Sequence, residues 1–270
     1  MTDLERFSFN QITANSATLR ECAEACTRHG VRWIAPWRHR LEEAGLSESS
    51  RILRDCGLSV SSLCRGGFFP AATHAERQQR IDDNRRAIDE AADLQARCLV
   101  LVCGPAPGRD IDGARAMVAD GIAAIMDHAQ RNGVRLGIEP LHPMFAADRS
   151  VIVTLAEALD LARRFNPEQV GVVVDAFHVW WDPQLYPGIQ RAVGYIAGFH
   201  VSDWSSPLPG VFTGRSMMGA GVIELRRMRN AIDQAGYRGA IEVEIMNETL
   251  WSRPVDAIFE QAIESYLACL

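Results

Sequence analysis

The 270-residue sequence contains no lysine, and all 28 of its basic residues are arginine. A guanidinium group stays protonated in proteins and does not form a Schiff base. The missing amine therefore excludes Schiff-base aldolases, pyridoxal enzymes and P-loop nucleotide hydrolases, which each depend on a lysine. Any reaction of this chain must use carboxylates, histidines or a metal ion.

Several other features are also missing. The net charge is −6 and no run of five or more basic residues occurs, so the chain lacks the positive surface that nucleic-acid binding needs. No apolar stretch reaches the roughly 18 residues that span a bilayer. The N-terminal segment does not resemble a signal peptide, and the seven cysteines are scattered and odd in number. We expect a cytoplasmic protein with no nucleic-acid or membrane partner, and the sequence leaves open whether it forms a homo-oligomer.

Short β-branched or aromatic runs alternate with amphipathic segments along the chain. Eight such runs begin at residues 7, 31, 58, 98, 135, 170, 196 and 239. The segments between them, such as 74–94 and 152–165, carry apolar residues at helical spacing. Eight strand–helix units of about 34 residues favour a closed (β/α)₈ TIM barrel of the α/β class over an open doubly wound sheet. Because no linker divides the chain, we expect residues 1–270 to form a single domain.

Four consecutive predicted strands end in residue types that bind metal ions. Glu139 ends the fifth, Asp175 the sixth, His200 the seventh and Glu244 the eighth. In a barrel, these strand ends meet at the mouth, where active sites lie. A buried carboxylate needs a compensating partner, and a single one could pair with an arginine. Four together favour one divalent cation, Mn²⁺ or Mg²⁺ for this oxygen-rich set, with Co²⁺ or Zn²⁺ tolerated.

Polar and aromatic residues near these strand ends are candidates for contacting a substrate. The candidates are His178, Arg215, His142, Trp37, Arg65, Asp203 and Trp204. Tryptophans suit the apolar faces of sugar rings, but packing beneath loops is the alternative. Arg65 and the two following glycines either hold an anion or form a tight turn, and His142 either contacts substrate or caps loop carbonyls. The longest irregular stretch, 205–221, is expected on the catalytic rim.

Over nearly its whole length, the chain resembles the sugar phosphate isomerase/epimerase family of xylose isomerase-like TIM barrels. The most specific matches are VVVDAFHVWWDP, GFHVSDW, GRSMMGAGVIEL, GYRGAIEVEI and NETLWSRP, with IAPWRHR, CRGGFFP and IEPLHPM upstream. The resemblance implies a metal ion held by Glu139, Asp175, His200 and Glu244. It also implies that His178 and Arg215 touch substrate oxygens. In related ketose epimerases the two metal-bound glutamates move protons, and these correspond here to Glu139 and Glu244.

The implied reaction is metal-dependent proton abstraction beside the carbonyl of a small sugar or polyol, through an enediolate. Returning the proton to the other face gives epimerisation, and returning it to the neighbouring carbon gives isomerisation. Loss of hydroxide from the β-carbon would instead make the protein a lyase, a dehydratase of a keto-sugar or keto-inositol. The family's usual Gly-Asp-Gly is Gly219-Ala220-Gly221 here, and Glu224 replaces an aspartate, so substrate choice stays open.

Two remoter classes are weighed against an isomerase. Apurinic endonucleases share this barrel, but their three-zinc site needs more histidines than the four near the mouth, His74, His142, His178 and His200. They also need a basic groove, which the charge balance disfavours. The second alternative is a non-catalytic barrel subunit of a larger complex, which a chelator would destabilise although no sugar is turned over.

Overall fold

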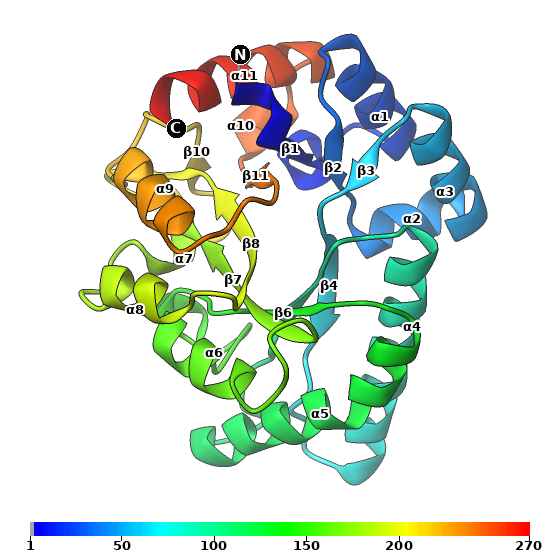
Figure 1. The fold of residues 1–270 in the computed structure, drawn as a ribbon, viewed down its shortest axis with the longest axis vertical. Helices are drawn as coiled ribbons and strands as arrows, with labels where there is room; N and C mark the ends of the chain where they lie inside the picture. Colours follow the sequence, from blue (N-terminus) through cyan, green and yellow to red (C-terminus); the bar gives the residue numbers. More distant parts are fainter. Residues whose placement is uncertain (1–2) are drawn as a thin grey trace.

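The computed structural model describes residues 3–270 and shows one parallel sheet that curves into a nearly closed barrel (Figure 1). In sheet order, its nine strands are β3 (Ser59–Val60), β2 (Trp33–Ala35), β1 (Phe7–Asn10), β11 (Ile241–Val243), β8 (Ile196–Val201), β7 (Val170–Asp175), β6 (Leu136–Glu139), β5 (Leu99–Val102) and β4 (Leu63–Gly67). The first strand therefore lies beside the last one. This arrangement confirms the predicted TIM barrel.

The third predicted strand is one bent stave, formed by β3 and β4. β3 pairs with β2, β4 pairs with β5, and a bridge between Trp37 and Cys64 joins the two sides. Between the two pieces, the hydroxyls of Ser61 and Ser62 both donate to the Glu242 carboxylate. Successive residues of a regular strand face opposite sides, so two neighbours that both point inward require this break.

Most of the helices ring the outside of the barrel (Figure 1), whereas the four-residue helix that follows β7 lies at the mouth. The helices are α1 (Leu19–Arg28), α2 (Arg38–Ala44), α3 (Leu46–Asp55), α4 (His74–Asp93), α5 (Ile111–Arg131), α6 (Leu155–Ala162), α7 (Ala176–Val179), α8 (Leu185–Arg191), α9 (Leu225–Gln234), α10 (Glu248–Trp251) and α11 (Val255–Cys269). Short 3₁₀ helices span Asp3–Arg6 (η1), Gln11–Ala14 (η2) and Pro143–Phe145 (η3). Within residues 3–270, every helix is too short or too polar to cross a lipid bilayer.

Reciprocal side-chain caps fix the starts of three of these helices. Thr18, Thr73 and Thr154 each accept the amide hydrogen of a glutamate three residues later, and that glutamate's carboxylate accepts the threonine amide hydrogen. Each cap satisfies two backbone donors that a helix start leaves free. The boundaries of α1, α4 and α6 are therefore set locally by the sequence.

Part of the barrel interior is apolar towards the N-terminal ends of the strands. Cys98, Val100 and Val173 form a separate buried cluster there. One layer nearer the C-terminal ends, the register pairs Val102 with Glu139 and Asp175 with His200. Below the mouth, the interior is therefore apolar around β5 and β7, whereas around β11 it holds the buried Glu242 carboxylate and the serine hydroxyls that donate to it.

The stretch 205–221 after β8 is less irregular than predicted. Its residues Arg215–Ser216 form β10, which pairs antiparallel with β9 (Asp203–Trp204). The buried Asp203 carboxylate accepts the amide hydrogens of Gly219 and Ile223, at 2.9 and 3.0 Å. These bonds hold the loop in a defined path across the mouth and give Arg215 its position.

Candidate metal centre and active site

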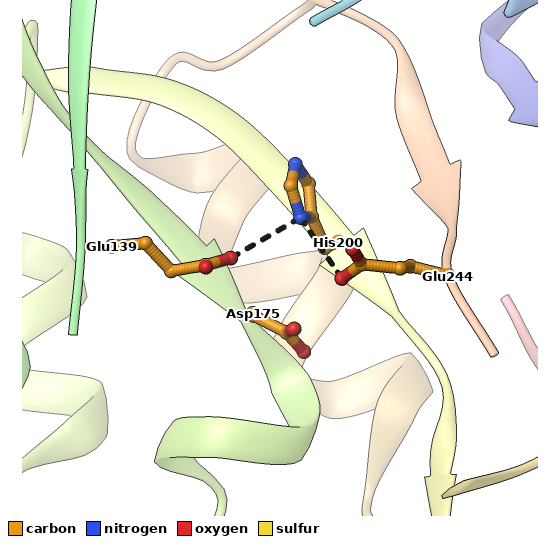
Figure 2. A group of neighbouring side chains, drawn as sticks. All are labelled: Glu139, Asp175, His200 and Glu244. Carbon is orange, nitrogen blue, oxygen red and sulfur yellow. Dashed lines mark ion pairs between the residues drawn. The ribbon is translucent and has the colours of Figure 1, made fainter. Parts of the chain in front are cut away.

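Glu139, Asp175, His200 and Glu244 converge at the C-terminal end of the barrel, as predicted (Figure 2). They come from the ends of β6 and β7, from β8, and from the position directly after β11. One potential ligand atom from each residue lies within 4.8 Å of the others. None of the four residues is more than 5 % exposed. Adjacent parallel strands in register bring these side chains together.

Several polar atoms in this cluster have no hydrogen-bond partner. His200 Nδ1 lies 3.4 Å from Glu139 Oε1 and 3.5 Å from Glu244 Oε2 (Figure 2). Neither contact has hydrogen-bond geometry, and Glu139 Oε1 and both ring nitrogens of His200 remain unpartnered. Buried polar atoms are rarely left unsatisfied, because each such atom costs about 1–3 kcal/mol. The donor set therefore fits a divalent cation.

The surroundings shift the pKa values of the three carboxylates in different directions. Burial raises the pKa of Asp175 to about 7, against the opposing effect of Arg215. Burial also raises the pKa of Glu139, and the nearby charge of Glu244 adds to the increase. Burial acts in the same direction on Glu244, but Arg215 and His200 outweigh it and lower that pKa to about 2. A cation would favour the charged form of all three carboxylates.

Arg215 and His178 lie beside the cluster and present donors to it. Arg215 Nη1 donates to Asp175 Oδ2 at 2.8 Å and to Glu244 Oε2 at 3.2 Å, while its Nη2 lies 3.1 Å from His178 Nε2. The backbone amide of His142 donates to His178 Nδ1. Burial, with the nearby Arg215, lowers the pKa of His178 well below its usual value. A neutral imidazole has one acceptor nitrogen, yet both nitrogens of His178 face donors, so one of these two contacts is left without an acceptor.

Beneath His200 lies a buried network that the sequence interpretation missed. Glu242 Oε1 lies 3.5 Å from His200 Nε2. The Glu242 carboxylate also accepts hydrogen bonds from Ser61, Ser62 and the Asn10 side-chain amide. A carboxylate on the second nitrogen of a metal-binding histidine fixes the orientation of the ring. The E-V-E spacing in IEVEI could have indicated this, because residues two apart on a strand face the same side.

A cavity of about 50 Å³ lies at the cluster and gathers most of the predicted site residues. The predicted residues that line it are Trp37, Arg65, Glu139, His178, Arg215 and Glu244. The Trp37 indole N–H donates to Asn10 Oδ1 at 2.8 Å, which fixes one wall. Lining residues that were not predicted include Arg149 and three phenylalanines, Phe145, Phe177 and Phe212.

Three other predicted contacts lie outside the lining of this cavity. The Asp203 carboxylate accepts hydrogen bonds from the loop amides of Gly219 and Ile223, and it holds the loop in place. His142 was expected either to contact substrate or to cap loop carbonyls. Its side chain instead caps a backbone amide, because His142 Nδ1 accepts the hydrogen bond of the Met144 N–H. The His142 ring packs 5.0 Å from the ring of Trp204, which itself stacks on Phe177 at 4.7 Å. These side chains support the wall from behind.

The departure from the family motif at Ala220 also lies away from the centre. Ala220 is exposed, and neither Ala220 nor Glu224 lines the cavity. A side chain at the neighbouring Gly221 would clash with the Trp204 carbonyl oxygen and with the Asp203 carboxylate. The glycine is therefore required by the loop, whereas position 220 faces solvent.

Known proteins are similar to this chain in structure and in sequence. Protein SMc04130 from Sinorhizobium meliloti 1021 is 47% identical, with 99% of each chain covered and a TM-score of 0.96. The IOLI protein, solved with a zinc atom, shares the fold at 18% identity, a TM-score of 0.86 and coverage of 98% of this chain and 97% of that one. The L-ribulose-5-phosphate 3-epimerase UlaE of Salmonella heidelberg (strain SL476) is 28% identical over 226 residues, 78% of this chain and 74% of the relative.

A sequence model for one family matches nearly the whole chain, over residues 21–269. The match includes all four residues of the buried cluster and the strands that carry them. The chain therefore belongs to the xylose isomerase-like TIM barrel family.

Proposed function

We propose that the protein is a divalent-metal-dependent isomerase or epimerase of a small sugar or polyol. The observation that carries this proposal is the placement of two glutamates. Glu139 and Glu244 come from β6 and from the end of β11, and they approach the centre from opposite sides (Figure 2). Both line the same cavity. The similarity to an L-ribulose-5-phosphate 3-epimerase supports the same class of reaction.

Glu139 and Glu244 act as the proton-transfer pair. One glutamate removes the proton from the carbon beside the carbonyl, and the electron pair forms a C=C bond while the carbonyl oxygen takes the negative charge. The other glutamate returns a proton to the opposite face, which inverts the centre. Return of the proton to the neighbouring carbon would interconvert aldose and ketose.

The remaining residues bind and orient the substrate. His178 and Arg215 both line the cavity, and they contact substrate oxygens there. Trp37 and the phenylalanines of the wall exclude water from the carbon that loses its proton. A cation held by Glu139, Asp175, His200 and Glu244, for which we favour Mn²⁺ or Mg²⁺, would stabilise negative charge on the substrate carbonyl oxygen.

The compartment we propose is the cytoplasm. All seven cysteines are free, and five of them are buried, namely Cys22, Cys26, Cys64, Cys98 and Cys103. Burial raises the pKa of the Cys98 and Cys103 thiols to about 12. Such thiols pack as small apolar groups and are unreactive. This use of cysteine fits a reducing environment.

The proposal is tested with Glu244→Gln, assayed in D₂O on a panel of keto-sugars and polyols. NMR should show deuterium entering the wild-type substrate, and exchange should fall at least about 10²-fold in the variant through loss of a general base. Metal content is measured in both proteins, so that loss of metal is not mistaken for loss of the base. Glu260→Gln, at an exposed position of α11, is the matched control. Unchanged exchange in Glu244→Gln, or a dehydrated product from the wild type, contradicts the proposal.

A further inference from the structure

Two arginines line the cavity without an acidic partner. Arg65 lies over the ring of Phe68, with its Cζ atom 4.0 Å from the ring centroid, and Arg149 lies over Phe212 at 4.6 Å. Among residues 3–270, neither guanidinium donates a hydrogen bond or forms an ion pair with a carboxylate. Both side chains are only partly exposed.

The two arginines stand at the junction of two cavities. Arg65, Arg149, Trp37 and Cys64 line both the cavity at the metal-ligand cluster and a neighbouring cavity of about 350 Å³. The outer cavity is therefore a continuation of the site, reached past these four side chains. It provides room for a part of the substrate that does not react.

The outer cavity carries an excess of positive charge, although the chain as a whole has a net charge of −6. Besides the two arginines above, its charged lining comprises Arg38, Arg80, Glu42 and Asp83. Asp83 is already engaged by Arg38, at 3.1 Å. One acid, Glu42, is left to balance Arg65, Arg80 and Arg149.

The surroundings of Arg65 make this excess costly. Burial lowers the pKa of Arg65, and the charge of Arg149 acts in the same direction. A partly buried cation is stabilised by a partner of opposite charge. The planar guanidinium fork is suited to paired oxygens of a phosphate or a carboxylate. An anionic ligand would relieve the repulsion between the two arginines.

We infer that the substrate carries a phosphate or carboxylate group, which Arg65 and Arg149 bind in the outer cavity while the reacting carbons lie between Glu139 and Glu244. This inference rests on the proposed function and specifies its class of substrate. It assigns recognition to the two unpaired arginines and proton transfer to the two glutamates.

Binding to the chelated protein tests the inference without any turnover. Calorimetric titrations use two probes, inorganic phosphate and glucuronate, on wild type, Arg65→Gln and Arg149→Gln. Each variant should bind the probes that wild type binds at least about tenfold more weakly, because it loses a charge-assisted hydrogen bond to the anion. Arg131→Gln, at an exposed position of α5 remote from the cavity, is the control and should bind as wild type.

The pattern of binding separates the sources of the anionic group. Binding of phosphate alone identifies a phosphate ester, binding of glucuronate alone identifies a sugar acid, and binding of both supports the shared anion site. No binding of either probe, or equal binding by wild type and both variants, overturns the inference. Arg65→Lys, which keeps the charge, should restore part of the affinity and guards against a folding defect in Arg65→Gln.

Kinetics separate a failure of this inference from a failure of the proposed function. Matched neutral and anionic sugars are assayed for deuterium exchange. Arg149→Gln should lower kcat/KM for the anionic sugar, mostly through KM, at least about tenfold more than it lowers kcat/KM for the neutral sugar. Equal kcat/KM for both sugars in wild type overturns the anion site alone. Probe binding without exchange into any sugar overturns the proposed function alone.

Discussion

The centre of the barrel mouth and its rim balance their charges in different ways. At the centre, the three carboxylates of Glu139, Asp175 and Glu244 share two basic side chains, Arg215 and His200. At the rim, Arg65 and Arg149 lie against the aromatic rings of Phe68 and Phe212, and no carboxylate among residues 3–270 forms an ion pair with either of them. The centre is short of positive charge and the rim of negative charge. A cation and an anionic substrate would complete the two regions separately.

The largest expected difference between the two regions concerns stability. Arg215→Met removes a fully buried cation from Asp175 and Glu244, and it should lower the free energy of unfolding of the chelated protein by about 3–5 kcal/mol. Arg149→Met at the rim should change it by no more than about 0.5 kcal/mol. Urea denaturation measures both. Equal losses would abolish the distinction between a paired centre and an unpaired rim.

Metal binding should depend on the centre alone. His200→Gln removes one of four ligands, and it should weaken the binding of Mn²⁺ at least about 10²-fold. This factor corresponds to roughly a quarter of the binding free energy that is typical of a structural zinc site. The same titration of Arg65→Gln should give the wild-type affinity. A rim variant that loses metal as strongly as His200→Gln would show that the two regions are not independent.

The residue beneath the centre should have a smaller effect. Glu242→Gln keeps the size of the side chain but removes the charge facing His200 Nε2. The affinity for Mn²⁺ should fall by about 10- to 100-fold, the range seen when an outer partner of a ligating histidine is lost. Glu264→Gln on α11 serves as the matched control. An unchanged affinity would mean that the strands alone orient the imidazole.

The affinity of the centre for Mn²⁺ should depend on pH. Because burial raises the pKa of Asp175 to about 7, this carboxyl is about half protonated at pH 7 in the metal-free protein, and a cation must displace that proton. The affinity for Mn²⁺ should therefore fall about tenfold between pH 8 and pH 6. A raised pKa also means that this carboxyl costs the metal-free protein stability as pH rises through 7. Thermal unfolding with and without Mn²⁺ should diverge increasingly over this interval.

The sequence was sufficient to predict which residues lie together at the centre, because the ends of the strands can be located in it. Glu139, Asp175 and His200 terminate apolar runs, and parallel strands in one barrel bring such ends to a common rim. Glu242 was overlooked because it lies inside the run that ends at Glu244, where a buried carboxylate is not expected without its partners. Those partners lie on β1 and on the third stave, and only tertiary structure brings them near.

The loops were harder to predict than the strands. Arg149 follows η3, and its position beside Arg65 depends on how the loop after β6 crosses the mouth. Asp203 was expected to contact substrate, but pairing of β9 with β10 turns it towards the loop amides. Residue type alone does not determine such directions, because loop paths are set by contacts remote in sequence.

The network around Glu242 bears on the order in which the protein assembles. This carboxylate joins side chains from β1 and from the third stave, and it comes from the last strand of the barrel. Before that strand docks, the His200 imidazole is not held in its orientation and Glu244, the fourth ligand, is not in place. Tight Mn²⁺ binding during refolding should therefore report ring closure itself, appearing late and in a single step rather than growing with each added βα unit.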